Sequence, residues 1–102
     1  MHKLTVQYCD PADPAVFEKH YREVHVALVT RIPGLRRFTI SKPHGLSATA
    51  PYLVAELWFD DAAALDAGLR SPEGSAASAD VQNFTVGYVG MFTGEVEELF
   101  AG

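Results

Sequence analysis

The sequence has one cysteine, only eight basic residues and no long hydrophobic run. With Cys9 alone no disulfide can form within the chain, and no Cys-x-x-Cys or Cys/His cluster indicates zinc. The basic residues are scattered apart from Arg36-Arg37, and the net charge is −5, so little positive charge is present to neutralise phosphates. We therefore expect no metal site and no nucleic-acid partner.

Motifs for membrane anchoring and for common cofactors are also missing. No apolar run is long enough for a signal peptide or a membrane span, which predicts no membrane partner and, by default, a cytoplasmic location. There is no Gly-rich phosphate loop, no P-loop and no Gly-x-Ser-x-Gly motif, so nothing supports flavin or nicotinamide binding. We expect no cofactor and chemistry limited to proton transfer, decarboxylation, isomerisation or cofactor-free oxygenation.

The residues that are present describe one small globular domain spanning residues 1–102, with 48% hydrophobic and 21% charged residues. Hydrophobic periodicity predicts strands at 2–9, 35–42, 52–59 and 86–93, and helices at 14–32, 62–70 and 72–82. In the first helix the predicted apolar stripe consists of Phe17, Tyr21, Val24, Leu28 and Ile32. The order β-α-β-β-α-β predicts an α+β, ferredoxin-like fold with a four-stranded antiparallel sheet and both helical segments on one face.

One predicted strand, residues 52–59, is apolar on both of its faces. Helices cover only one face of a ferredoxin-like sheet, so this strand indicates that the second face is covered too. No residues of the chain are left to cover it, and another subunit is the simplest cover. We therefore expect a homodimer in which two sheets pack face to face as a dimeric α+β barrel.

Several segments together resemble the EthD-like family. The segment from Phe17 to Leu28 contains a His-Tyr pair and a second histidine near it, and Pro33-Gly34-Leu35 follows the helix. The strand segment Ala55–Asp60 and the late segment Asp80–Phe84 fit as well, so the resemblance covers most of the chain. The family usually has proline two residues after the second histidine, where this chain has Ala27.

The resemblance implies a dimeric α+β barrel with a ligand cavity in each subunit. Relatives include lactone isomerases, polyketide cyclases and decarboxylases, cofactor-free monooxygenases, and proteins of ether degradation. Because a fold does not determine a function, the chemistry has to be argued from individual residues.

His25 is the first candidate for acid–base chemistry, since imidazole exchanges protons near neutral pH. On a regular α-helix it lies about 60° from the centre of the apolar stripe, beside Tyr21, while His20 lies on the opposite shoulder. The two histidines are therefore not expected to share a metal as an i, i+4 pair would. A hydrogen-bonded structural role remains the alternative for His25, as does a core role for Tyr21.

Glu56 is the second candidate, because it is the lone acid in an otherwise apolar strand. In a cavity its pKa would rise towards that of a general base, and a salt bridge to Lys3 or an arginine is the alternative. The polar face of the first strand, with Thr5 and Gln7, and the aromatic residues Trp58 and Phe92 are candidates for binding a small molecule. Core or surface roles are the alternatives for all four.

Two functions follow. The first is binding of a small, partly apolar compound (aromatic, lactone or polyketide-like) in the barrel cavity, with cofactor-independent chemistry of isomerase, cyclase, decarboxylase or monooxygenase type centred on His25. The second is a non-catalytic accessory or binding protein for an oxygenase in a degradation pathway.

Overall fold

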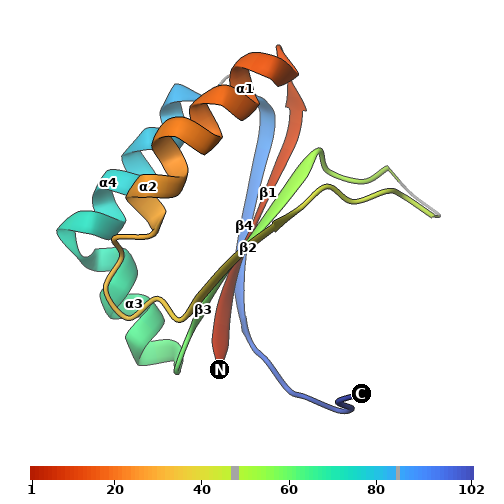
Figure 1. Cartoon of the computed structure of the whole chain (residues 1–102). Helices are drawn as coiled ribbons and strands as arrows, with labels where there is room; N and C mark the ends of the chain where they lie inside the picture. The colour runs from red at the N-terminus through yellow and green to blue at the C-terminus, as the bar shows by residue number, and fades with distance from the viewer. Residues whose placement is uncertain (47–48, 85) are drawn as a thin grey trace.

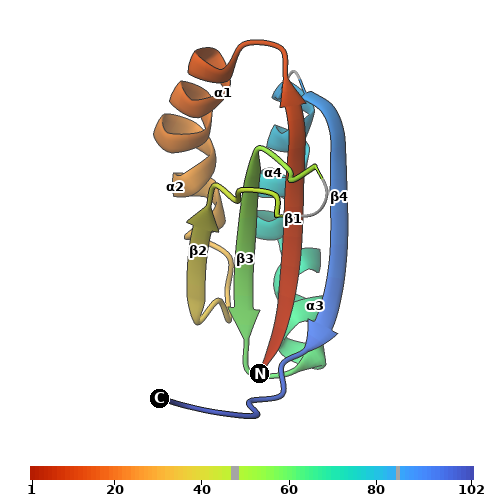
Figure 2. The same cartoon turned by 90° about the vertical axis from the view of Figure 1, so that its right-hand side faces the viewer.

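The computed structural model describes residues 1–46, 49–84 and 86–102. Its strands form one antiparallel sheet in the order β2-β3-β1-β4, which confirms the predicted ferredoxin-like arrangement (Figures 1 and 2). The strands are β1 (His2–Pro11), β2 (Arg37–Ser41), β3 (Leu53–Phe59) and β4 (Val86–Glu95). The helical segments are α1 (Pro14–His20), a π-helical turn η1 (Tyr21–His25), α2 (Val26–Val29), α3 (Ala62–Arg70), α4 (Pro72–Asp80) and a 3₁₀ turn η2 (Val81–Asn83).

All helices lie on one face of the sheet (Figure 1). Each long helical segment begins at a side-chain cap: Asp13 accepts bonds from the backbone of α1, Asp61 from α3 and Ser71 from α4. Gly68 allows α3 to pack closely, because a Cβ atom there would lie 2.8 Å from the carbonyl oxygen of Pro33. At this point α3 therefore lies directly against the segment that follows α2 and against the ring of Phe59 in β3.

The first helix contains a π-helical turn that the sequence pattern did not predict. The backbone N–H of Val26 donates to the carbonyl of Tyr21, five residues earlier, instead of four. The predicted apolar stripe is consequently wrong in its middle: Val24 is 40% exposed and Leu28 only half-buried, whereas His25 and Val29 are buried. A helical wheel at a constant 100° per residue cannot represent the extra residue of such a turn.

In the part of the chain that the structure describes, no helix covers the opposite face of the sheet, as Figure 2 shows from that side. Alternation along β1 sends Leu4, Val6 and Tyr8 into the core, so Lys3, Thr5 and Gln7 project from this open face. Residues 42–46 and 49–52, between β2 and β3, extend to the same side of the sheet as the C-terminal tail (Figure 1).

No helix in the described part of the chain is both long and apolar enough to cross a membrane.

Candidate functional site

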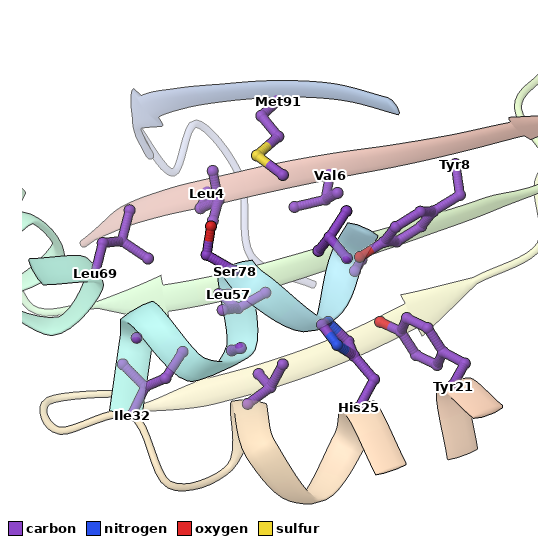
Figure 3. Close-up of a pocket in the computed structure, with 15 residues that line it drawn as sticks. Leu4, Val6, Tyr8, Tyr21, His25, Ile32, Leu57, Leu69, Ser78 and Met91 are labelled. Atoms are coloured by element: carbon purple, nitrogen blue, oxygen red, sulfur yellow. The ribbon is translucent and has the colours of Figure 1, made fainter. Parts of the chain in front are cut away.

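A pocket of about 150 Å³ lies between the helix layer and the sheet (Figure 3). Strands supply its apolar floor, and α2, α3, α4, η2 and the turn after α2 supply the remaining apolar wall. Its polar groups are the side chains of Tyr8, Tyr21, His25 and Ser78. The remaining lining residues are Leu4, Val6, Val29, Ile32, Ala55, Leu57, Leu69, Gly74, Ala77, Val81 and Met91. A cavity of about 150 Å³ accommodates a single benzene-sized ring in an apolar protein interior.

The carboxylate of Asp80, at the end of α4, joins both histidines of the first helix. His25 Nδ1 lies 2.9 Å from Asp80 Oδ2, and His20 Nε2 lies 2.8 Å from Oδ1 and 3.0 Å from Oδ2. The amide of Asn83 donates to Oδ1 at 3.0 Å. Because an ionised carboxylate only accepts, the two ring nitrogens that face it act as donors. Three donors from two segments therefore satisfy one buried carboxylate, and they hold its pKa below the ordinary value although burial opposes this.

This network fixes which nitrogen of His25 can act as a base. Nδ1–H donates to Asp80, so Nε2 is the ring nitrogen left for a ligand. The residue is only 3% exposed, and this burial lowers the pKa of the imidazole, with the bond and charge of Asp80 acting in the opposite direction. His25 is therefore a neutral imidazole at pH 7 with a fixed tautomer.

Two tyrosine hydroxyls point towards the same part of the pocket as His25 (Figure 3). Tyr21 comes from the π-helical turn and Tyr8 from β1, and their ring centroids lie 5.6 Å apart. Burial raises the pKa of both hydroxyls, so both remain protonated donors. The hydroxyl of Tyr21 is buried and has no partner within normal hydrogen-bond distance among the residues that the structure describes, although the hydroxyl of Tyr8 is near enough to influence its pKa. An unpaired buried hydroxyl costs free energy, which an oxygen atom of a ligand would recover.

The other sequence-predicted site residues lie on the open face and do not reach this pocket. Paired positions in the sheet place Thr5 beside Glu56 and Phe92, and Lys3 beside Trp58. Glu56 forms a salt bridge with Lys3 instead of lining a cavity in the subunit, and Lys3 Nζ lies 2.5 Å from Glu56 Oε2. Gln7 follows Thr5 on the same face, in register with Val54. Within a single subunit these residues and His25 therefore lie on opposite faces of the sheet, and their roles in binding or catalysis stay predictions.

Comparison with known proteins agrees with this architecture. The model of the EthD domain matches residues 10–87, which is more than half of the chain. The chain belongs to the EthD family. An uncharacterised 11.0 kDa protein from the thcB-thcC intergenic region of Rhodococcus erythropolis is 44% identical over 98 residues, covering 93% of this chain and 95% of that protein.

Some solved structures resemble this EthD chain in both sequence and fold, and others resemble it in fold alone. An ethyl tert-butyl ether d (ethd) family protein from Bacillus halodurans is 31% identical, with a TM-score of 0.87 over 95% of this chain and 99% of that one. SnoaB, a cofactor-independent oxygenase from Streptomyces nogalater, is 16% identical, with a TM-score of 0.73 over 99% of this chain and 97% of that one. The second similarity concerns the fold alone.

Sequence reasoning missed the roles of Asp80 and His20 in this EthD domain. His20 and His25 were expected on opposite shoulders of the helix, but the π-helical turn between them lets both rings reach Asp80. The sequence feature that could have indicated this role is Asp80, because it is a single acid that follows a run of Ala and Ser and precedes Asn83 by three residues. In the described residues, no group of three or more His, Cys, Asp or Glu side chains is arranged to hold a metal ion.

Proposed function

We propose that this EthD protein binds a small, partly apolar compound in the pocket between its helices and its sheet, and that His25 acts on it as a cofactor-independent acid–base group. The observation that supports this most is the surroundings of His25. The imidazole is buried, held by Asp80 through Nδ1, and lines an apolar pocket beside two protonated hydroxyls.

The pocket restricts the compound to about one ring. Its volume of about 150 Å³ lies below the 300–1,000 Å³ range of most ligand sites, so only a compact aromatic, lactone or polyketide-like ring fits without a structural change. Its polar groups favour an oxygen substituent next to Tyr21, whose hydroxyl lacks a partner within the described chain.

The same groups support one elementary step. His25 Nε2 accepts a proton from a carbon next to a ring carbonyl, and the electron pair of the broken C–H bond moves onto the carbonyl oxygen. The tyrosine hydroxyls donate hydrogen bonds to that oxygen as its negative charge develops. Return of the proton to another carbon completes an isomerisation, and cyclisation or reaction with oxygen starts from the same stabilised anion. Decarboxylation of a β-keto acid reaches that anion by another route, since loss of CO₂ leaves the electron pair of the broken C–C bond on the carbonyl oxygen, and a proton then returns to the carbon. SnoaB, which shares the fold, is a cofactor-independent oxygenase.

The proposal is tested by proton exchange in D₂O. Phenol, 2-cyclohexen-1-one and a six-membered lactone are incubated with the protein, and NMR follows both binding and the loss of α-protons from the ketone and the lactone. His25→Gln should retain most of the affinity and slow exchange by about 10²–10⁴-fold, the usual contribution of general acid–base catalysis. His44→Gln, at an exposed position in the segment between β2 and β3, is the matched control and should leave exchange unchanged.

Three results would change this assignment. Binding without exchange would favour the second function, a non-catalytic accessory or binding protein for an oxygenase. Equal exchange by wild type and a folded His25→Gln variant would remove His25 from the mechanism. Failure of all three compounds to bind would contradict the pocket as a ligand site.

We also propose a cytoplasmic homodimer joined through the open faces of the two sheets. Phe92 is 53% exposed on this face, and Trp58 lies between Lys3 and Arg37, with the two cations 5.0 Å and 5.2 Å from its ring. Solved proteins of similar fold from Thermobifida fusca and Bacteroides fragilis are dimeric. A second copy would cover the exposed aromatic surface and close the barrel.

A further inference from the structure

The Asp80 cluster connects two sides of the helix layer. On the inner side, the side chain of His25 is 4% exposed and lines the pocket. On the outer side, the side chain of His20 is 29% exposed and lines a separate hollow of about 220 Å³ together with Asp13 and Asn83. The carboxylate of Asp80 is the hydrogen-bonding partner that the two rings share, and the ring of Phe84 also packs edge-on against both.

We propose that His20 is a positioning residue for His25, acting through the carboxylate of Asp80 that the two rings share. The charge state of the exposed ring then sets how readily the buried ring accepts a proton. The consequence for catalysis rests on the function proposed above, whereas the coupling between the rings does not.

The argument follows from the single negative charge of Asp80. When His20 is neutral, that charge is available to stabilise an imidazolium ion at His25. When His20 is protonated, its own positive charge already neutralises the carboxylate, and a second positive charge at His25 is opposed. Coulomb interactions between groups this close persist at the effective dielectric constant of a protein interior. His20 can exchange protons with solvent because its ring is partly exposed, so solvent pH reaches the buried site through it.

The other ionisable groups near the two rings are two tyrosines and two aspartates. His25 is faced by Asp80 of α4, by Tyr8 of β1 and by Tyr21 of its own helix. Burial raises the pKa of both tyrosines, so they stay neutral over the range in which histidine titrates. Near His20, Asp13 lines the hollow while its carboxylate caps α1. The ionisable groups that bear on His25 in this cluster are therefore the carboxylate of Asp80 and the ring of His20.

Histidine titration by NMR on ¹⁵N-labelled protein without any ligand tests the coupling. His20→Gln keeps an N–H donor for Asp80 but removes the ionisable ring. We expect the apparent pKa of His25 to rise by about 0.5–2 pH units, with Nδ1–H still bonded to Asp80. His44→Gln removes an exposed histidine outside the cluster and should leave the titration of His25 unchanged.

An unchanged titration of His25 in folded His20→Gln would overturn the proposal. If that variant fails to fold, the wild-type protein decides: the ring resonances of His25 should show a second inflection at the pH at which His20 titrates, and its absence would count against coupling. Because no ligand is present, the outcome is independent of the proton-exchange assay. Coupling without exchange activity would reject the proposed function alone, and exchange activity without coupling would reject this inference alone.

Discussion

Both faces of the sheet carry ionisable side chains, but the surroundings of these side chains differ. On the helix-covered face, His25 and Asp80 are 3% and 6% exposed and bond each other. On the open face, Glu56 and Lys3 form a salt bridge whose side chains are 27% and 32% exposed. The covered face also contains the apolar pocket, while the open face presents the exposed ring of Phe92.

This difference shows that chemical type alone does not identify an acid–base site. A group becomes a useful base when desolvation and a fixed partner determine its protonation state, and the covered face supplies both for His25. The ion pair between Lys3 and Glu56 on the open face is partly exposed to solvent, and in the proposed dimer it would face the second subunit. The proposed function therefore assigns the chemistry to the covered face and association to the open face.

The largest effect is expected from removing the carboxylate that organises the covered face. Asp80→Ala leaves the donors of His20, His25 and Asn83 without their shared acceptor, and we expect it to lower the free energy of unfolding by roughly 3–5 kcal/mol. Urea denaturation measures this. Asp66→Ala, which removes an exposed partner of Arg70, should cost less than about 1 kcal/mol. Equal losses in the free energy of unfolding would show that the Asp80 cluster stabilises the fold no more than an exposed ion pair does.

A somewhat smaller effect is expected from placing a charge on the open face. Phe92→Asp should weaken the dimer by roughly 2–4 kcal/mol, if Phe92 is a central contact of the interface, without unfolding the subunit. Val16→Asp is the control, because Val16 is 64% exposed on α1, on the helix side of the molecule. Sedimentation velocity distinguishes the two variants. A wild-type protein that is monomeric at micromolar concentration would contradict the assignment of the open face to association.

The pH dependence of stability should also reveal the buried position of His25 on the covered face. Burial lowers the pKa of His25 in the folded state, so below its ordinary pKa the unfolded chain binds more protons than the folded one. The contribution of His25 is therefore fully present above about pH 6.5 and is lost as the pH falls through the folded-state pKa. Thermal unfolding between pH 8 and pH 5 should show this loss in wild type and a flatter profile in His25→Gln. Identical profiles would mean that His25 ionises equally in both states.

The smallest effect is expected from Glu56. Glu56→Gln removes the charge of a partly exposed ion pair, which typically contributes less than about 1 kcal/mol. Because Glu56 lies across the sheet from the pocket, proton exchange should stay within about two-fold of wild type. A loss of exchange comparable to that of His25→Gln would place the chemistry on the open face instead.

Much of the fold was accessible from sequence because it depends on local patterns. Alternation located all four strands to within a few residues, and Asp13-Pro14 and Pro33-Gly34 marked the ends of the first helical region. The π-helical turn was not accessible, since no periodic pattern signals one extra residue in a helix. The meeting of His20 with Asp80 depends on that turn and on contact between segments 60 residues apart. Which face His25 and Glu56 occupy likewise required the packed structure.

A crystal structure of the protein soaked with phenol tests most directly which face binds a ligand. We predict a ring in the pocket between the helices and the sheet, with its oxygen within hydrogen-bonding distance of Tyr21 and its edge against His25. A ring bound instead on the open face, between Trp58 and Phe92, with the covered pocket empty, would contradict the assignment of chemistry to the helix-covered face.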